Sequence, residues 1–254
     1  MRLKMGGRVA YWFLSHFFPR SRTVSDSRGA HLIRYPQRLR KIIGDRQWDL
    51  LKSQRVVDFG CGHGDGAIDL AMEGCQNVVG IDIRHSVLDH ALQRASEAGV
   101  LDRCQFVTHL PAGSADVVIS MDAFEHFDDP KEILQTIANL LPSGGQVIVS
   151  FGPTWYHPRG GHLFSPFPWA HLLFSESSLC RWRRDFRDDG AITFADVDGG
   201  LNQMTIARFE QMVHNGPFDV ELMIARPIHL LRRLHCRSTR EFLTSVVDCI
   251  LVKR

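Results

Sequence analysis

The chain has 254 residues, of which 44% are hydrophobic and 23% charged, and its formal net charge is +2. This composition is typical of a globular protein, and the length suits one large α/β domain or a domain with a small cap. No apolar stretch approaches the roughly 20 residues that a membrane span requires, and the six cysteines are scattered without a CxxC pair. The sequence argues against a spanning helix, a disulfide framework and a zinc knuckle, and we expect a cytoplasmic protein.

The N-terminal segment is strongly basic. Residues 1–55 hold 13 Lys and Arg against 3 Asp and Glu, a net charge of +10, whereas the other 199 residues hold 17 against 25, a net charge of −8. Such a segment can face an anionic substrate, nucleic acid or lipid headgroups, or it can be a solvated helical face that docks on an acidic body. Within it, VAYWFLSHFF (9–18) predicts an amphipathic cap helix, with weak membrane-surface contact as the alternative.

Short apolar runs and helical patterns alternate from residue 55 onward. The runs that predict strands are 55–59, 78–82, 104–107, 116–120 and 146–151. The segments 84–98 and 130–141 have helical period, and the second starts with Asp129 as a cap and Pro130 at the first helical position. Strands that alternate with helices predict a parallel sheet in a doubly wound, Rossmann-like α/β fold.

The C-terminal part departs from this alternation. Residues 218–226 and 245–254 predict two further strands around a basic helical stretch, 227–243, which gives seven strands with the last antiparallel. Residues 152–186 are rich in Pro, Gly, His and aromatic side chains, and we interpret them as the start of an ordered lid after the fifth strand. The expected single domain, 1–254, comprises a helical cap (1–54), a ligand-binding core (55–151), a lid (152–217) and C-terminal strands with a helix (218–254).

Four alternating glycines follow the first predicted strand, in VVDFGCGHGDG (56–66). Glycines at a strand-to-helix turn allow the backbone to come close to a ligand. One interpretation is a dinucleotide site, because GHGDGA (62–67) fits GxGxxA and Asp82 lies about 20 residues further on. Against it, Asp58 stands two residues before the first glycine, where a carboxylate suits a cationic ligand better than a pyrophosphate.

Taken whole, VVDFGCGHG resembles the DxGxGxG loop of the class I S-adenosylmethionine (SAM)-dependent methyltransferases. VVGIDI (78–83) resembles the second signature of that family. DVVISMDAFEHFDDP (116–130) resembles the region of the fourth strand in its UbiG-like, methyltransferase type 11 branch. The three motifs occur in the expected order and spacing. The resemblance implies a Rossmann-like enzyme that uses SAM as its cofactor.

The resemblance also implies roles for the matching residues. Asp58 would lie near the methionyl ammonium of SAM, Asp82 would accept hydrogen bonds from both ribose hydroxyls, and Ile83 would pack on the adenine. The expected cofactor-binding residues are Asp58, Gly60, Cys61, Gly62, Gly64, Asp82, Ile83, His109, Met121, Asp122 and Arg38. His109 stands in for an acid that relatives place after the third strand and that is missing here. Arg38, with Arg34 in reserve, would meet the SAM carboxylate unless it belongs to a solvated helix face.

Two clusters would supply catalytic groups, and the candidates are His157, His126 and Tyr156. In DAFEH, the residues Asp122, Glu125 and His126 would suit a divalent metal, as in some quinone methyltransferases, but local packing is the alternative and we expect no metal. In the lid motif WYHPRGGH, His157 would act as a general base and Arg159 would hold an anionic acceptor group. The alternative is that these polar groups tie the lid together by hydrogen bonds.

We therefore expect a methyltransferase that acts on an oxygen or nitrogen of a small molecule. The aromatic residues Trp155, Tyr156, Phe164, Phe167 and Trp169 would line an apolar acceptor pocket. Three alternatives stay open: an RNA methyltransferase that uses the basic N-terminal segment, a non-catalytic partner protein with this fold, and a nucleotide-dependent oxidoreductase. We expect a small-molecule substrate, no nucleic acid, no membrane span, and a monomer or homodimer.

Overall fold

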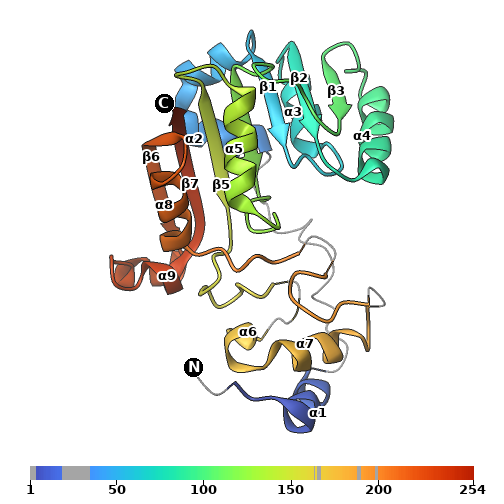
Figure 1. The fold of residues 1–254 in the computed structure, drawn as a ribbon, viewed down its shortest axis with the longest axis vertical. Coiled ribbons are helices and arrows are strands. Elements are labelled where there is room, and N and C mark those ends of the chain that lie inside the picture. The colour runs from blue at the N-terminus through green and yellow to red at the C-terminus, as the bar shows by residue number, and fades with distance from the viewer. Residues whose placement is uncertain (1–3, 19–34, 163, 165–166, 188–189, 198–199) are drawn as a thin grey trace.

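A seven-stranded sheet forms the centre of the computed structural model, which describes residues 4–18, 35–162, 164, 167–187, 190–197 and 200–254. The strand order is β3-β2-β1-β4-β5-β7-β6 (Figure 1). The strands are β1 (Arg55–Phe59), β2 (Asn77–Ile81), β3 (Cys104–Val107), β4 (Val117–Met121), β5 (Gln146–Phe151), β6 (Phe218–Pro227) and β7 (Thr244–Lys253). β1 to β5 pair in parallel, whereas β7 is antiparallel to both of its neighbours, β5 and β6. The predicted fold class, a doubly wound Rossmann-like sheet with an antiparallel last strand, is confirmed.

Helices cover both faces of this sheet and bury two separate apolar clusters. On one face lie α2 (Tyr35–Leu51), α3 (Asp65–Met72) and α4 (His85–Glu97), and on the other lie α5 (Pro130–Leu140) and α8 (Ile206–His214). Successive strand residues point to opposite faces, so Val56 joins the first cluster and Val57 the second. Burial on both faces explains why central strands such as VVISM in β4 are continuous apolar runs.

The helices predicted from periodicity are present as α4 and α5, with nearly the predicted bounds. At the start of α5 the Asp129 carboxylate accepts hydrogen bonds from the N–H groups of Lys131 at 3.0 Å and Glu132 at 3.1 Å. Pro130 is the first helical residue. The cap therefore satisfies two of the N–H groups that a helix start leaves without intrahelical partners.

The basic stretch 227–243 does not form the single helix that its pattern predicts. It is divided into a 3-10 helix, η2 (His229–Leu234), and one helical turn, α9 (Arg240–Leu243). Between them the Cys236 N–H donates to Thr239 Oγ1 at 2.9 Å, which closes a local turn. Ser and Thr side chains compete in this way with helical hydrogen bonding.

A third apolar cluster lies in the lid, away from the sheet. The helices α1 (Gly7–Phe17), α6 (Ala170–Leu173) and α7 (Glu176–Arg183) surround it, and Figure 1 shows them together below the sheet. The buried members are Ala10, Leu14, Trp155, Phe164, Ala170, Phe174, Leu179, Cys180, Trp182, Ala191, Phe194, Val197 and Leu201. Ahead of α1, the Met5 N–H donates to the Leu173 carbonyl at 2.9 Å, and the Ser175 N–H donates to the Met5 carbonyl at 2.8 Å. The described residues of the lid therefore pack around an apolar core that is separate from those of the sheet.

The grouping of helices differs from the expected one in two places. Residues 1–54 do not act as one cap, because α1 packs in the lid whereas α2 packs on the sheet. The expected lid, 152–217, includes α8, yet Phe209 and Val213 of α8 are buried in the sheet cluster beside α5. Both differences have the same cause: an amphipathic pattern shows which residues of a helix are buried but not the body against which they pack.

The packing of α1 predicts unequal effects for two substitutions on that helix. Leu14 is fully buried in the lid cluster, so Leu14→Ala should lower the free energy of unfolding by about 2–5 kcal/mol through lost contacts and a cavity. Trp12 is exposed on the outer face, and Trp12→Ala should change the same quantity by less than about 0.5 kcal/mol. Denaturant unfolding followed by circular dichroism measures both effects. Equal losses in the two variants would contradict this packing.

Candidate active site

The loops after β1, β2 and β4 meet at the carboxyl edge of the sheet. β1 lies between β2 and β4, so the chain crosses over in opposite directions on either side of it, and such a switch point leaves a crevice for a ligand. The N–H groups of Gly60 and Cys61 both donate to the Ile81 carbonyl, at 2.8 and 2.9 Å. These bonds fasten the glycine loop to the end of β2 and set its position in the crevice.

The glycines of this loop serve two different purposes. Gly60, Gly62 and Gly64 all have a positive φ, of 79°, 52° and 78°. A Cβ on Gly60 would lie 2.9 Å from the Ala123 side chain, and one on Gly64 would lie 2.7 Å from the Phe106 ring. A Cβ on Gly62 would meet no atom nearer than Arg84 Nη2 at 4.0 Å. Gly60 and Gly64 are thus required by packing, and Gly62 is the glycine of this loop that leaves room for a ligand.

The side chains at the end of β2 suit a ribose and an adenine. Asp82 is buried, and its carboxylate accepts hydrogen bonds from the Gly62 N–H at 3.0 Å and from the backbone and side chain of Arg84 at 3.0 and 3.1 Å. Burial alone would raise the pKa of Asp82, but the hydrogen bonds from Arg84 and Gly62 outweigh it and hold the pKa below its usual value. Next to it Ile83 is 84% exposed, a position in which an apolar side chain can cover the face of a ligand. The open face at Gly62, the Asp82 carboxylate and the exposed Ile83 thus lie next to one another at the end of β2.

Asp58, at the end of β1, lies deeper in the structure. The Tyr35 hydroxyl donates to its Oδ1 at 3.1 Å. Burial raises the pKa of Asp58 to about 7, although the hydrogen bonds from Tyr35 and from the Ala67 N–H act in the opposite direction. A cation placed near this carboxyl would favour its ionised form.

Two of the predicted cofactor-binding residues bind each other. Arg38 on α2 donates from its two terminal nitrogens to the Asp122 carboxylate, at 2.5 and 2.8 Å. Arg38 Nη2 also donates to Ser150 Oγ at 2.6 Å, and that hydroxyl donates to Asp248 Oδ1 at 2.6 Å. Asp248 is 1% exposed, and Arg226 on β6 donates to its other oxygen. A chain of alternating charges therefore runs from the loop after β4 to the edge strand.

The sequence reasoning missed Ser150, Asp248 and Arg226. Asp248 stands inside the apolar run SVVDCILV of β7, and this position could have indicated that it has polar partners. A charged side chain is buried in a strand only where such partners are present. Ser150 is its register partner on β5, and the sequence alone does not give that pairing.

The possible metal ligands of the DAFEH motif have separate partners. Asp122 binds Arg38, Glu125 Oε1 accepts from the Gly152 N–H at 3.0 Å, and His126 Nδ1 lies 2.7 Å from the Gly200 carbonyl. Burial raises the pKa of Glu125, whose Oε2 is buried without a hydrogen-bond partner. Over the residues described, no three side chains of the metal-binding types converge.

The lid histidines are held by local backbone. His157 Nδ1 accepts from the Arg159 N–H at 2.9 Å, and burial, with the nearby Arg159 charge, lowers the pKa of His157 to about 4. His171 Nδ1 accepts from the Gly161 N–H at 3.1 Å. A ring that accepts at Nδ1 carries its proton on Nε2, which does not favour His157 as a general base.

The aromatic residues of the lid are not arranged as one acceptor pocket. Trp155 and Phe164 are buried in the lid cluster, so their predicted place in a pocket is wrong. Tyr156 and Trp169 are partly exposed, and the Tyr156 ring lies 5.3 Å from the ring of Phe242 on α9. The composition predicted an ordered, aromatic-rich lid but not the direction in which each ring points, because that depends on the turn geometry of the lid.

The other predicted residues lie at or just after the ends of β1, β3 and β4. Met121 is buried at the end of β4, and His109 is exposed with its Nδ1 3.2 Å from Thr108 Oγ1. Cys61 lies in the glycine loop, and burial raises the pKa of its thiol. Arg34 lies outside the described residues.

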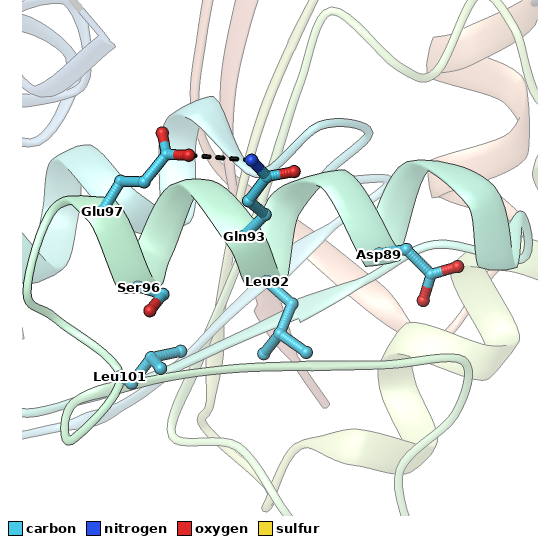
Figure 2. Close-up of a pocket in the computed structure, with 6 residues that line it drawn as sticks. All are labelled: Asp89, Leu92, Gln93, Ser96, Glu97 and Leu101. Atoms are coloured by element: carbon cyan, nitrogen blue, oxygen red, sulfur yellow. Dashed lines mark hydrogen bonds between the residues drawn. The ribbon is translucent and has the colours of Figure 1, made fainter.

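A shallow depression elsewhere on the surface does not belong to this crevice. Figure 2 shows it along α4 and the turn that leads to β3. Its lining residues are Asp89, Leu92, Gln93, Ser96, Glu97 and Leu101, and Gln93 donates to Glu97 at 2.8 Å. None of them is a predicted site residue.

Comparison with known proteins decides the family. A family model described as a methyltransferase domain matches residues 30–215, which is more than half of the chain. The chain belongs to this methyltransferase family. The recognition of a class I SAM-dependent methyltransferase, with SAM as the cofactor, is confirmed.

The chain is similar to methyltransferases with different names. A ubiquinone biosynthesis O-methyltransferase of Stutzerimonas stutzeri is 31% identical over 156 residues, which are 53% of this chain and 64% of that protein. Phosphoethanolamine N-methyltransferase 1 of Arabidopsis thaliana is 33% identical over 108 residues, which are 40% of this chain and 22% of that protein. The matches thus span less than two thirds of the length of either relative. An S-adenosylmethionine dependent methyltransferase from Mesorhizobium loti has the same fold, with a TM-score of 0.54 at 17% identity over 84% of this chain and 100% of that one.

The two kinds of glycine predict different results for the same substitution. In Gly62→Ala the new Cβ meets open space. The free energy of unfolding should therefore fall by only about 1–2 kcal/mol, the cost of placing an alanine at a positive φ. The affinity for SAM should fall about tenfold or more. In Gly64→Ala the Cβ collides with Phe106 and Ala91, and the thermal midpoint should drop much further. Differential scanning fluorimetry and calorimetric titration with SAM separate the two effects. Unchanged SAM affinity in Gly62→Ala would show that the open face is not part of the cofactor site.

Proposed function

We propose that the chain transfers the methyl group of SAM to an oxygen or nitrogen atom of a small aromatic or apolar acceptor. The observation that carries the proposal is the group formed by Asp82, Gly62 and Ile83 at the switch point. There the Gly62 N–H donates to an ionised Asp82, and the exposed Ile83 stands next to it.

Each residue of this group would meet one part of the cofactor. Asp82 would accept from the ribose hydroxyls, in exchange for part of its contact with the half-exposed Arg84 side chain. Ile83 would cover the adenine, and the backbone at Gly62 would pass close to the amino-acid part. Asp58 would stabilise the methionyl ammonium of SAM from its buried position at the end of β1. The ion pair of Asp122 and Arg38 would offer one negative and one positive charge to the amino-acid part of SAM.

Methyl transfer places modest demands on the protein. When bound, SAM supplies a methyl group on a sulfonium, which is activated for in-line displacement. The chain has to align the acceptor and exclude water, and the lid is the part of the fold available for that task. Of the proposed catalytic residues, Tyr156 is exposed at the border of the lid and His126 lies in the loop after β4. We therefore favour Tyr156 and His126 over His157 as the catalytic residues.

The names of two relatives and the aromatic residues at the border of the lid support the proposed acceptor class. The names of the two relatives give an oxygen and a nitrogen as methylated atoms. Tyr156, Trp169 and Phe242 expose aromatic surface on the same side of the lid motif, since Trp169 Nε1 donates to the Tyr156 carbonyl at 3.0 Å and Phe242 lies against the Tyr156 ring. This surface supports an aromatic or apolar acceptor.

Ion pairs in the basic segment disfavour the alternative of RNA methylation. Within the described part of this segment, cations bind acids of the same chain in the pairs Arg38–Asp122, Arg40–Asp45, Lys52–Asp49 and Arg55–Asp116. Phosphate binding by these side chains would require those contacts to break. We further propose that the enzyme works in the cytoplasm as a monomer or homodimer.

Cofactor binding is the first test of this function. Calorimetric titration with SAM and its demethylated product should give micromolar affinity for the wild type, and Asp82→Asn should weaken it by about tenfold or more because a charged acceptor is lost. Asp116→Asn is a matched control, since Asp116 also binds an arginine but lies before β4, at the opposite edge of the sheet. Transfer of labelled methyl from SAM to a panel of phenols, catechols and amines then identifies the acceptor. The absence of binding to either ligand would overturn the proposal.

Asp58 predicts a pH dependence of cofactor affinity. Its pKa of about 7 leaves the carboxyl largely protonated at low pH, and a bound ammonium favours the ionised form. The affinity for SAM should therefore rise with pH, by up to about tenfold per unit, and level off above that pKa. Asp82 stays ionised throughout, because its pKa is held below the usual value. Calorimetry at several pH values should give a flat profile for Asp58→Asn, and a slope equal to that of the wild type would exclude this role.

A further inference from the structure

The outer face of α1 carries a stripe of large apolar side chains. Val9, Trp12 and His16 recur at helical spacing on the face opposite to the buried Ala10 and Leu14. The Trp12 and His16 rings stack at 5.2 Å. The exposed apolar side chains of α1 are Val9 at 66%, Trp12 at 59% and Phe17 at 56%, and the Trp12 ring lies 6.3 Å from the Phe17 ring. Monomeric proteins rarely expose large apolar side chains together unless the patch contacts a partner.

Cationic side chains border this stripe on one flank. Arg8 is exposed in the first turn of the helix, and Lys4, ahead of the helix, donates from Nζ to the His171 carbonyl at 3.0 Å. Further along the same flank, the Arg181 guanidinium of α7 lies 4.3 Å from the centre of the Tyr11 ring. Asp185 on this flank is held by the Tyr11 hydroxyl at 3.0 Å. The surface thus combines an aromatic, apolar centre with a flank that carries the cations Arg8 and Arg181 and one acid, Asp185.

We propose that this surface docks on a lipid bilayer that contains anionic headgroups. Trp and Phe side chains are favoured at the boundary between headgroups and acyl chains, and exposed Lys and Arg are attracted to anionic lipid. α1 has 11 residues, and none of the helices in the described ranges is long and apolar enough to cross a membrane, so α1 lies in the plane of the interface. A second copy of the chain is the weaker candidate, because a two-fold contact through α1 would bring the same cationic flanks together.

The proposal goes beyond methyl transfer and assigns a surface to the lid. The buried face of α1 belongs to the lid cluster through Ala10 and Leu14. A bilayer on the outer face would therefore hold the lid at the membrane surface, while the sheet and the cofactor crevice remain in water.

Vesicle co-sedimentation tests the proposal on the whole chain. The probes are vesicles of phosphatidylcholine alone and vesicles with about one quarter phosphatidylglycerol, at low and high salt. The wild type should bind the anionic vesicles at least about tenfold more tightly than the neutral ones, and salt should weaken this binding. Trp12→Glu should reduce binding about tenfold or more, and Arg8→Glu should reduce it mainly at low salt. Leu92→Glu is the matched control, because Leu92 is similarly exposed but lies on α4, far along the chain from the lid.

Three outcomes would overturn the proposal. One is that the wild type does not bind anionic vesicles. The second is that Trp12→Glu and Leu92→Glu bind as the wild type does, or lose binding equally. The third is a concentration-dependent dimer in analytical ultracentrifugation that Trp12→Glu breaks, which would assign the surface to a second copy. Calorimetric SAM binding and the thermal midpoint, unchanged in each variant, show that the fold is intact.

Discussion

Close packing beneath the glycine loop is the constraint on which the site depends. A Cβ on Gly64 would lie 2.7 Å from Phe106, one on Gly66 would lie 2.5 Å from the Tyr35 ring, and one on Gly80 would meet Phe106 as well. The start of α3 can approach β3 and α2, and β2 can pack under the Phe106 ring, only because these positions lack side chains. This approach brings Asp82 within hydrogen-bond distance of the Gly62 N–H and leaves Gly62 itself facing open space. Close packing at Gly64, Gly66 and Gly80 thus sets the position of Gly62 and Asp82 at the carboxyl edge of the sheet.

The second requirement is charge balance at the same edge. Asp122 and Asp248 bring carboxylates to adjacent parts of the sheet, and Arg38 and Arg226 supply the opposite charges. Ser150 links the two pairs, because it accepts from Arg38 and donates to Asp248. Buried or partly buried charges are tolerated only with such partners. Arg38 therefore also fixes α2 over the end of β4.

The sequence predicted the features that are encoded locally. The strands, α5 with its Asp129 cap, and the succession of Asp58, Asp82 and Asp122 at strand ends all follow from short contiguous motifs. The Ser150–Asp248 hydrogen bond joins residues 98 positions apart, and nothing in either stretch specifies the pairing of β5 with β7. For His157 the residue type suggested a base, whereas the fold turned its ring toward the Arg159 N–H. The role of the His157 side chain thus depends on the backbone N–H group that the turn places next to its ring.

The lid and the crevice are joined through a short segment of backbone. Leu201 is buried in the lid cluster, and the next residue, Asn202, clamps the loop after β4. Its side chain donates to the carbonyls of Phe124 at 2.6 Å and Phe127 at 2.8 Å, and its N–H donates to the Glu125 carbonyl at 3.0 Å. That loop starts with Asp122, the partner of Arg38. The Asn202 hydrogen bonds therefore tie the end of the lid core to the loop that carries Asp122, although the lid and the sheet each have an apolar core of their own.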